Sequence, residues 1–150
     1  MIATLIAVLG TLAGAVVAGM MQHLSTARTE RAAKGERRRQ ALAEGIPALL
    51  AAVVGHREQQ YLKIEARRDG LADTVEARRA RYAARSAVTS AMDALYMTTS
   101  DRSLLAVAQE AVDAAMAIGD VPAEELAAAG LRARKAHTAL REAGAAALSA

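Results

Sequence analysis

The chain has 150 residues and a net charge of +3, and it is 53% hydrophobic although only 2% of its residues are aromatic. Alanine fills 40 positions, whereas Phe, Trp and Cys are absent. The lack of cysteine excludes disulfides, thiolate catalysis and Cys-ligated zinc. A chain so rich in alanine favours long helices packed through small side chains, so we predict an all-α fold.

The first 27 residues form an uncharged segment, with no Asp, Glu, Lys or Arg between Ile2 and Ala27. Its apolar run of about 20 residues spans roughly 30 Å as a helix, the thickness of a bilayer's hydrocarbon core. We therefore predict a single transmembrane helix over residues 1–23. A cleaved signal peptide fits less well because no cationic side chain precedes the run. The remaining alternative is a soluble helical oligomer with residues 2–21 as buried core.

Small residues recur every four positions in this segment, at Gly10, Gly14 and Ala18. Such spacing lets two helix backbones approach closely inside a membrane. We expect these residues to form a helix-association face, which predicts a homo-oligomer.

A block of cations follows the apolar segment, opposed only by Glu30 and Glu36. Its members are Arg28, Arg31, Lys34, Arg37, Arg38 and Arg39. Positively charged residues beside a span stay on the cytoplasmic side and attract anionic lipid. The block therefore predicts an outer amino terminus, a cytoplasmic carboxyl-terminal part and location in the cell (inner) membrane. We expect residues 24–45 to form a basic juxtamembrane helix, which "EGIP" at 44–47 ends through Gly45 and Pro47.

Residues 46–150 are predicted to form a cytoplasmic α-helical domain, a coiled-coil-like hairpin or bundle that continues from the transmembrane helix. Apolar residues at helical spacing predict helices over 47–69 and about 72–97, with Gly70 between them. The second stripe includes Leu71, Val75 and Tyr82, followed by Val88, Met92 and Leu95. Thr98 with Asp101 resembles a capping box before a third helix.

The third helix contains a clear apolar stripe, and Gly119 is expected to stop it. The last helix, at about 122–148, begins after the acidic stretch around Pro122. Its stripe follows a heptad of small residues, which favours close approach to a partner helix. The members of that stripe are Leu126, Ala129, Ala133, Ala136, Leu140, Ala143 and Ala147.

No catalytic motif stands out. His23, His56 and His137 occur singly, and neither a phosphate-binding glycine loop nor a nucleophile elbow is present. We therefore expect no enzyme activity, no cofactor and no metal site.

A second basic region lies around the repeated sequence "EARR". Its cations are Arg67, Arg68, Arg78, Arg79, Arg81 and Arg85. Clustered arginines can neutralise nucleic-acid phosphates, so one interpretation is a membrane adaptor that contacts nucleic acid through residues 67–85. The other is a solvated helix face, because acidic residues are interleaved with the arginines.

Four pieces of the chain resemble short actinobacterial KilB-type proteins of conjugative plasmids and related integrated elements. They are "MIATLIAVLGTLAGAVVAGMMQH", "ERAAKGERRRQ", "HREQQYLKIEARR" and "RSAVTSAMDAL". The resemblance runs over most of the chain and implies a membrane-anchored accessory role in plasmid transfer or spread. Together with the helical pattern, it predicts a membrane-anchored scaffold that acts through a protein partner the sequence does not identify.

Overall fold

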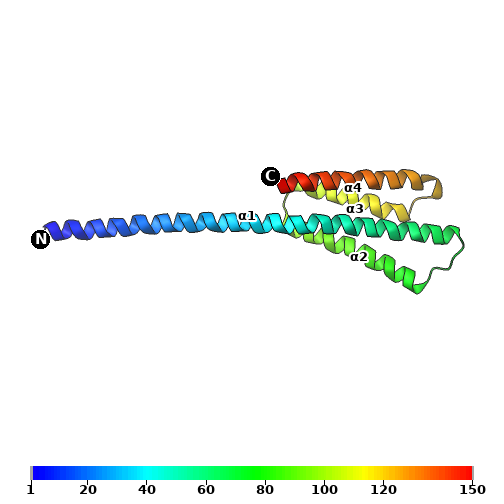
Figure 1. Cartoon of the computed structure of the whole chain (residues 1–150), viewed down its shortest axis with the longest axis horizontal. Helices are drawn as coiled ribbons and strands as arrows, with labels where there is room; N and C mark the ends of the chain where they lie inside the picture. The colour runs from blue at the N-terminus through cyan, green and yellow to red at the C-terminus, as the bar shows by residue number, and fades with distance from the viewer. Residues whose placement is uncertain (1, 150) are drawn as a thin grey trace. The chain divides into compact units, whose positions relative to one another are not determined.

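The structure is a computed structural model that describes the backbone of residues 2–149 and the side chains of residues 28–149. Every regular element in that range is helical, which confirms the all-α fold (Figure 1). The elements in chain order are α1 (Ile2–Arg68), α2 (Val75–Thr98), α3 (Arg102–Met116), η1 (Ala117–Gly119), η2 (Ala123–Glu125) and α4 (Leu126–Ser149). The chain divides into two compact units, Met1–Arg38 and Arg39–Ala150.

The first unit consists of the amino-terminal part of α1, and nearly all of its described side chains are exposed. Among the described residues, no helix has the length and apolar character needed to cross a membrane. The transmembrane helix expected over residues 1–23 lacks support from the structure and falls on side chains outside those described. The association face of Gly10, Gly14 and Ala18 lies there too, so both stay predictions.

The second unit is a four-helix bundle. Residues 39–68 of α1 run antiparallel to α2, α3 turns back again, and α4 returns antiparallel to α3 (Figure 1). The connections are short, as neighbouring antiparallel helices require. The helices expected after residue 46 are thus confirmed, with starts at Val75 and Leu126 instead of about 72 and 122.

Helix α1 continues through the stretch that was expected to end it. Pro47 lies inside the helix, and Gly45 also has helical backbone. Proline removes one backbone hydrogen bond and crowds the preceding turn, which costs about 3 kcal/mol in a helix interior. The prediction of a break was wrong because Ile46 and Leu49 are buried on either side of Pro47, and their burial favours a continuous helix.

Local sequence signals set the other helix ends. Gly70 has φ +70°, and the amide of Leu71 donates to the carbonyl of Ala66 at 2.9 Å, which ends α1 in a Schellman motif. The Thr74 hydroxyl caps α2 by accepting from the amide of Ala77 at 3.1 Å. Asp101 caps α3, whereas the Thr98 hydroxyl donates back to the carbonyl of Ala94; the expected capping box is therefore replaced by a single Asp cap.

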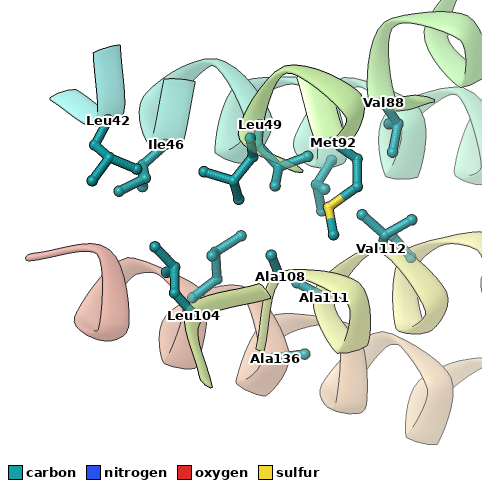
Figure 2. Packing of buried hydrophobic residues seen from close by; sticks show 14 residues of the cluster. Leu42, Ile46, Leu49, Val88, Met92, Leu104, Ala108, Ala111, Val112 and Ala136 are labelled. Atoms are coloured by element: carbon teal, nitrogen blue, oxygen red, sulfur yellow. The ribbon is translucent and has the colours of Figure 1, made fainter. Parts of the chain in front are cut away.

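Apolar side chains from all four helices meet in one core (Figure 2). Leu49 of α1, Leu95 of α2, Leu104 of α3 and Leu140 of α4 are 0–2% exposed. The stripe predicted for the third helix is confirmed, because Leu104, Ala108, Val112 and Ala115 are buried. In the last helix, Ala129, Ala133, Ala136 and Leu140 of the predicted stripe are buried, whereas Leu126, Ala143 and Ala147 are partly exposed. Small residues let α3 and α4 pack closely, which compensates for the lack of Phe and Trp.

Two glycines of α4 allow close contact with α1. A Cβ at Gly144 would lie 2.6 Å from Cγ2 of Ile46, and a Cβ at Gly130 would overlap the Tyr61 hydroxyl. Real Cβ atoms do not approach other atoms so closely, so a side chain at either position forces a neighbour to shift. That neighbour is the buried Ile46 at Gly144 and the hydroxyl end of the Tyr61 side chain at Gly130.

Replacing Gly144 by alanine is therefore expected to lower the free energy of unfolding by about 1–3 kcal/mol, because Ile46 is buried and cannot move aside. The matched control is Gly45→Ala on α1, where a Cβ meets nothing within 4 Å. That change should raise stability by about 0.5–1 kcal/mol through helix propensity. Denaturant unfolding of both variants measures the difference, and equal effects would contradict the close packing.

Replacing Pro47 by alanine should raise the free energy of unfolding by about 1–3 kcal/mol, because the 47 amide can then bond within α1. Pro47 is exposed, so the change removes no core contact. The control is Ala48→Pro at the neighbouring exposed position, which should destabilise the bundle by about 3 kcal/mol. Thermal unfolding compares the two; a loss of stability in Pro47→Ala would show that α1 is not continuous at this point.

Candidate functional site

The core-facing stripe of α1 changes from apolar to polar halfway along the bundle. Its apolar part contains Leu42, Ile46, Leu49 and Val53, all buried. The same alternating spacing of four and three residues continues at His56, Gln60 and Lys63. His56 and Gln60 are only 2% and 9% exposed, so these polar groups occupy true core positions.

Helix α2 shows the same change in the opposite chain direction. Its buried residues are Val88, Met92 and Leu95. Counted back toward the amino terminus at heptad spacing, the next positions of this register are Arg85, Arg81 and Arg78. Arg81 is partly buried, whereas Arg78 and Arg85 are exposed.

Because α1 and α2 are antiparallel, the two polar half-stripes meet at the same end of the bundle. They line a partly open cavity of about 330 Å³ that η1 borders at Gly119 and Asp120. We name the six polar residues of the two stripes the arginine seam. They are His56, Gln60, Lys63, Arg78, Arg81 and Arg85.

The seam carries an excess of positive charge. Four cations line the cavity, and Asp73 and Asp120 are the only carboxylates among its lining residues. Nη2 of Arg81 donates to Oδ1 of Asp73 at 2.5 Å, and only 17% of the Arg81 side chain is exposed. The hydrogen bond from Arg81 lowers the pKa of Asp73, and the positive charges of Arg78 and Lys63 act in the same direction.

His56 is the most deeply buried member of the seam. Burial lowers the pKa of its imidazole, and the positive charge of Arg85 lowers it further, so the ring is neutral at pH 7. Its Nε2 lies 3.4 Å from Nε2 of Gln60. The Nδ1 atom of His56 is buried and has no hydrogen-bond partner.

Close backbone approach keeps Gln60 in place. A Cβ at Gly119 would lie 2.9 Å from Cδ of Gln60 and would overlap its side-chain oxygen. Gly119, which was predicted only as a helix stop, therefore also lets η1 cover the Gln60 end of the seam.

The six arginines predicted as one nucleic-acid surface are divided by the structure. Arg78, Arg81 and Arg85 line the seam cavity. Arg67 lines a different hollow, of about 680 Å³, at the α1–α2 turn, while Arg68 is exposed and pairs with Asp69 at 3.4 Å. Arg79 is exposed on α2 and lines neither hollow.

The apolar stripe expected along the first half of α2 was wrong. Leu71, Val75 and Tyr82 are 65%, 47% and 73% exposed. This stretch of sequence allows two helical stripes, one of apolar residues and one of arginines. The arginine stripe is the one in register with Val88, Met92 and Leu95. That heptad register was the sequence signal that could have revealed the seam.

The predicted juxtamembrane cations all have exposed side chains on α1. They are Arg28, Arg31, Lys34, Arg37, Arg38 and Arg39. At 100° per residue they cover an arc of about 200°, a broad face of the helix that is wider than a single stripe. Lipid contact by these residues stays a prediction.

The other described histidine, His137 on α4, has a buried Nδ1 without a partner. Burial lowers the pKa of its imidazole, and the charges of Arg57 and Arg141 add to the effect. Within residues 28–149, no three His, Asp or Glu side chains gather as a metal ion would require.

Comparison with known proteins finds a family that matches the bundle. The profile of the family described as KilB plasmid transfer protein matches residues 43–148. The chain is 40% identical over 92 residues to "Protein KilB" of Streptomyces lividans, which covers 60% of each chain, so the match spans about 60% of that relative's length. No solved structure matches the chain.

The matched range includes "HREQQYLKIEARR" and "RSAVTSAMDAL", on which the resemblance to KilB-type proteins partly rested, whereas the other two pieces precede residue 43. The resemblance is therefore confirmed for the bundle. Since the family profile covers more than half of the residues, the chain belongs to the KilB plasmid transfer protein family.

Proposed function

We propose that this chain is a non-enzymatic, membrane-anchored interaction protein that serves as an accessory in plasmid or mobile-element transfer. The observation that carries the proposal is the family match over residues 43–148, which includes nearly the whole four-helix unit. The bundle is therefore the part of the chain that matches a family described as plasmid transfer proteins.

The sequence before the bundle supports the anchoring part of the proposal. Residues 2–27 carry no Asp, Glu, Lys or Arg, and six exposed cations follow on α1 between residues 28 and 39. An uncharged stretch of this length followed by cations fits a span whose carboxyl-terminal side faces the cytoplasm.

Self-association is the second part of the proposal. The heptad of α4 is used inside the bundle, because Ala129, Ala133 and Leu140 are buried against the chain's own helices. A homo-oligomer is therefore better supported by Gly10, Gly14 and Ala18, whose spacing fits contact between two spans. Oligomers of this kind would present several bundles to a partner protein at one place on the membrane.

Nucleic-acid contact through residues 67–85 is the weaker alternative. Its six arginines lie in three settings: Arg78, Arg81 and Arg85 line the seam cavity, Arg67 lines a second hollow, and Arg68 and Arg79 are exposed outside both. Arg68 is paired with Asp69, so the uncompensated charge on the outer surface is small.

The anchoring proposal predicts that the full-length chain stays in the membrane pellet after alkaline carbonate extraction. Leu12→Arg combined with Val16→Arg should release it, because each arginine at the centre of a span costs about 2.5–3.5 kcal/mol on insertion scales. The control adds the same charge outside the segment, in Ala32→Arg, which should remain in the pellet because Ala32 is exposed on α1. Release of the unaltered chain would favour the soluble oligomer with residues 2–21 as its core.

The accessory role predicts that deleting the coding sequence from its natural genetic element lowers transfer to recipient cells without affecting maintenance in the donor. The unaltered chain supplied in trans should restore transfer, whereas the Leu12→Arg, Val16→Arg chain should not. Transfer frequency and donor copy number are the two measurements. Equal restoration by both chains would separate the transfer role from the membrane anchor, and unchanged transfer after deletion would contradict the role itself.

A further inference from the structure

The three arginines of the seam continue the heptad register of Val88, Met92 and Leu95 and line the cavity at the polar end of the bundle. Arg78 and Arg85 are exposed, whereas only 17% of the Arg81 side chain is exposed. Like charges gathered around one hollow repel one another, so a bound counter-charge stabilises this arrangement.

The charge and the donors of the seam fit an anion. Its cavity has four cations against two carboxylates, and Asp73 is already engaged by Arg81. Guanidinium groups bind phosphate through paired hydrogen bonds, and arginine is the residue most suited to that geometry. An excess of about two positive charges matches the dianion of a phosphate monoester.

His56 and Gln60 add polar groups without negative charge to the lining of the cavity. They are 2% and 9% exposed, and their Nε2 atoms lie 3.4 Å apart. The contribution of α1 to the lining therefore leaves the positive charge of the arginines uncompensated.

Size and surroundings favour a small molecule. A cavity of about 330 Å³ is at the lower end of the volumes of small-ligand pockets. Asp73 and Asp120 of the lining are exposed and repel a polyanion on the surface, whereas a single phosphate group in the cavity meets the larger charge of the four cations. Tyr82 lies at the same cavity and is 73% exposed, so it offers an aromatic face to the rest of the ligand.

From these observations we propose that the arginine seam is a binding site for a small phosphorylated molecule, with the phosphate held among Arg78, Arg81 and Arg85. Lys63 adds charge, and Asp73 orients Arg81 through their ion pair. The site does not depend on the proposed role in transfer or on membrane anchoring, because all of these residues belong to the bundle.

Titration calorimetry of the purified full-length chain tests the proposal, with inorganic phosphate and adenosine 5′-monophosphate as probes and chloride at equal ionic strength as reference. Both probes should bind saturably. Arg85→Gln should weaken binding at least about tenfold through loss of a charge-assisted contact. The matched control is Arg79→Gln, which removes the same charge from an exposed position of α2 outside the cavity and should change the affinity less than about twofold.

Thermal unfolding shows whether each variant is folded and gives a second measure of binding. Phosphate should raise the melting temperature of the unaltered chain above that in chloride, because a ligand that binds only the folded state stabilises it. Arg78→Gln, at an exposed seam position, serves as a second variant and should also lose binding. No saturable binding, no thermal shift, or equal losses in the Arg79 and Arg85 variants would each overturn the proposal.

Two further probes separate a free small molecule from larger sources of phosphate. A short DNA duplex and vesicles containing phosphatidic acid are titrated under the same conditions. If either binds through Arg85 while inorganic phosphate and adenosine 5′-monophosphate do not, the small-molecule site is wrong. Binding of the two small probes with the expected dependence on Arg85 supports it.

Discussion

The antiparallel heptad register of α1 and α2 is the constraint on which the rest of the bundle depends. It brings Leu49 of α1 into one core with Val88 and Met92 of α2 (Figure 2), and Val53 belongs to the same core. Once these residues are packed, the helical repeat also fixes where the following residues point. The positions of His56 and Arg85 within the bundle follow from that register, so the apolar core and the polar seam are two parts of one arrangement.

The alanine-rich helices α3 and α4 complete the bundle at close range. Alanine contributes little buried area, but it loses no side-chain entropy and lets helix backbones approach. Gly130 and Gly144 bring α4 still closer to α1, against Tyr61 and Ile46. The bundle therefore gains stability from many close contacts, and a single added methyl group matters more here than in a core built of large side chains.

Much of the helical architecture could be predicted from the sequence, because caps and stripes are local signals. Asp101, Gly70 and the alanine heptad of α4 are examples whose effects do not depend on distant residues. The predicted helix end at Pro47 was wrong because a proline costs less free energy there than burial of the residues around it contributes. The predicted apolar stripe through Tyr82 was wrong because the sequence allows two helical stripes, and only packing against α1 selects one.

The location of the family match adds a reason to regard the seam as more than a packing irregularity. The match covers residues 43–148 and so includes every seam residue, whereas the apolar segment and most of the following cations precede it. Among the seam arginines, Arg81 is the most buried, with 17% of its side chain exposed, and Asp73 is its partner. Arg78 and Arg85 are exposed but line the cavity, so their charge is accessible to an anion that enters it. Arg79 is equally exposed and lies outside the cavity, so the register of α2 alone distinguishes cations that can act together on one bound group from a cation that acts singly on the outer face.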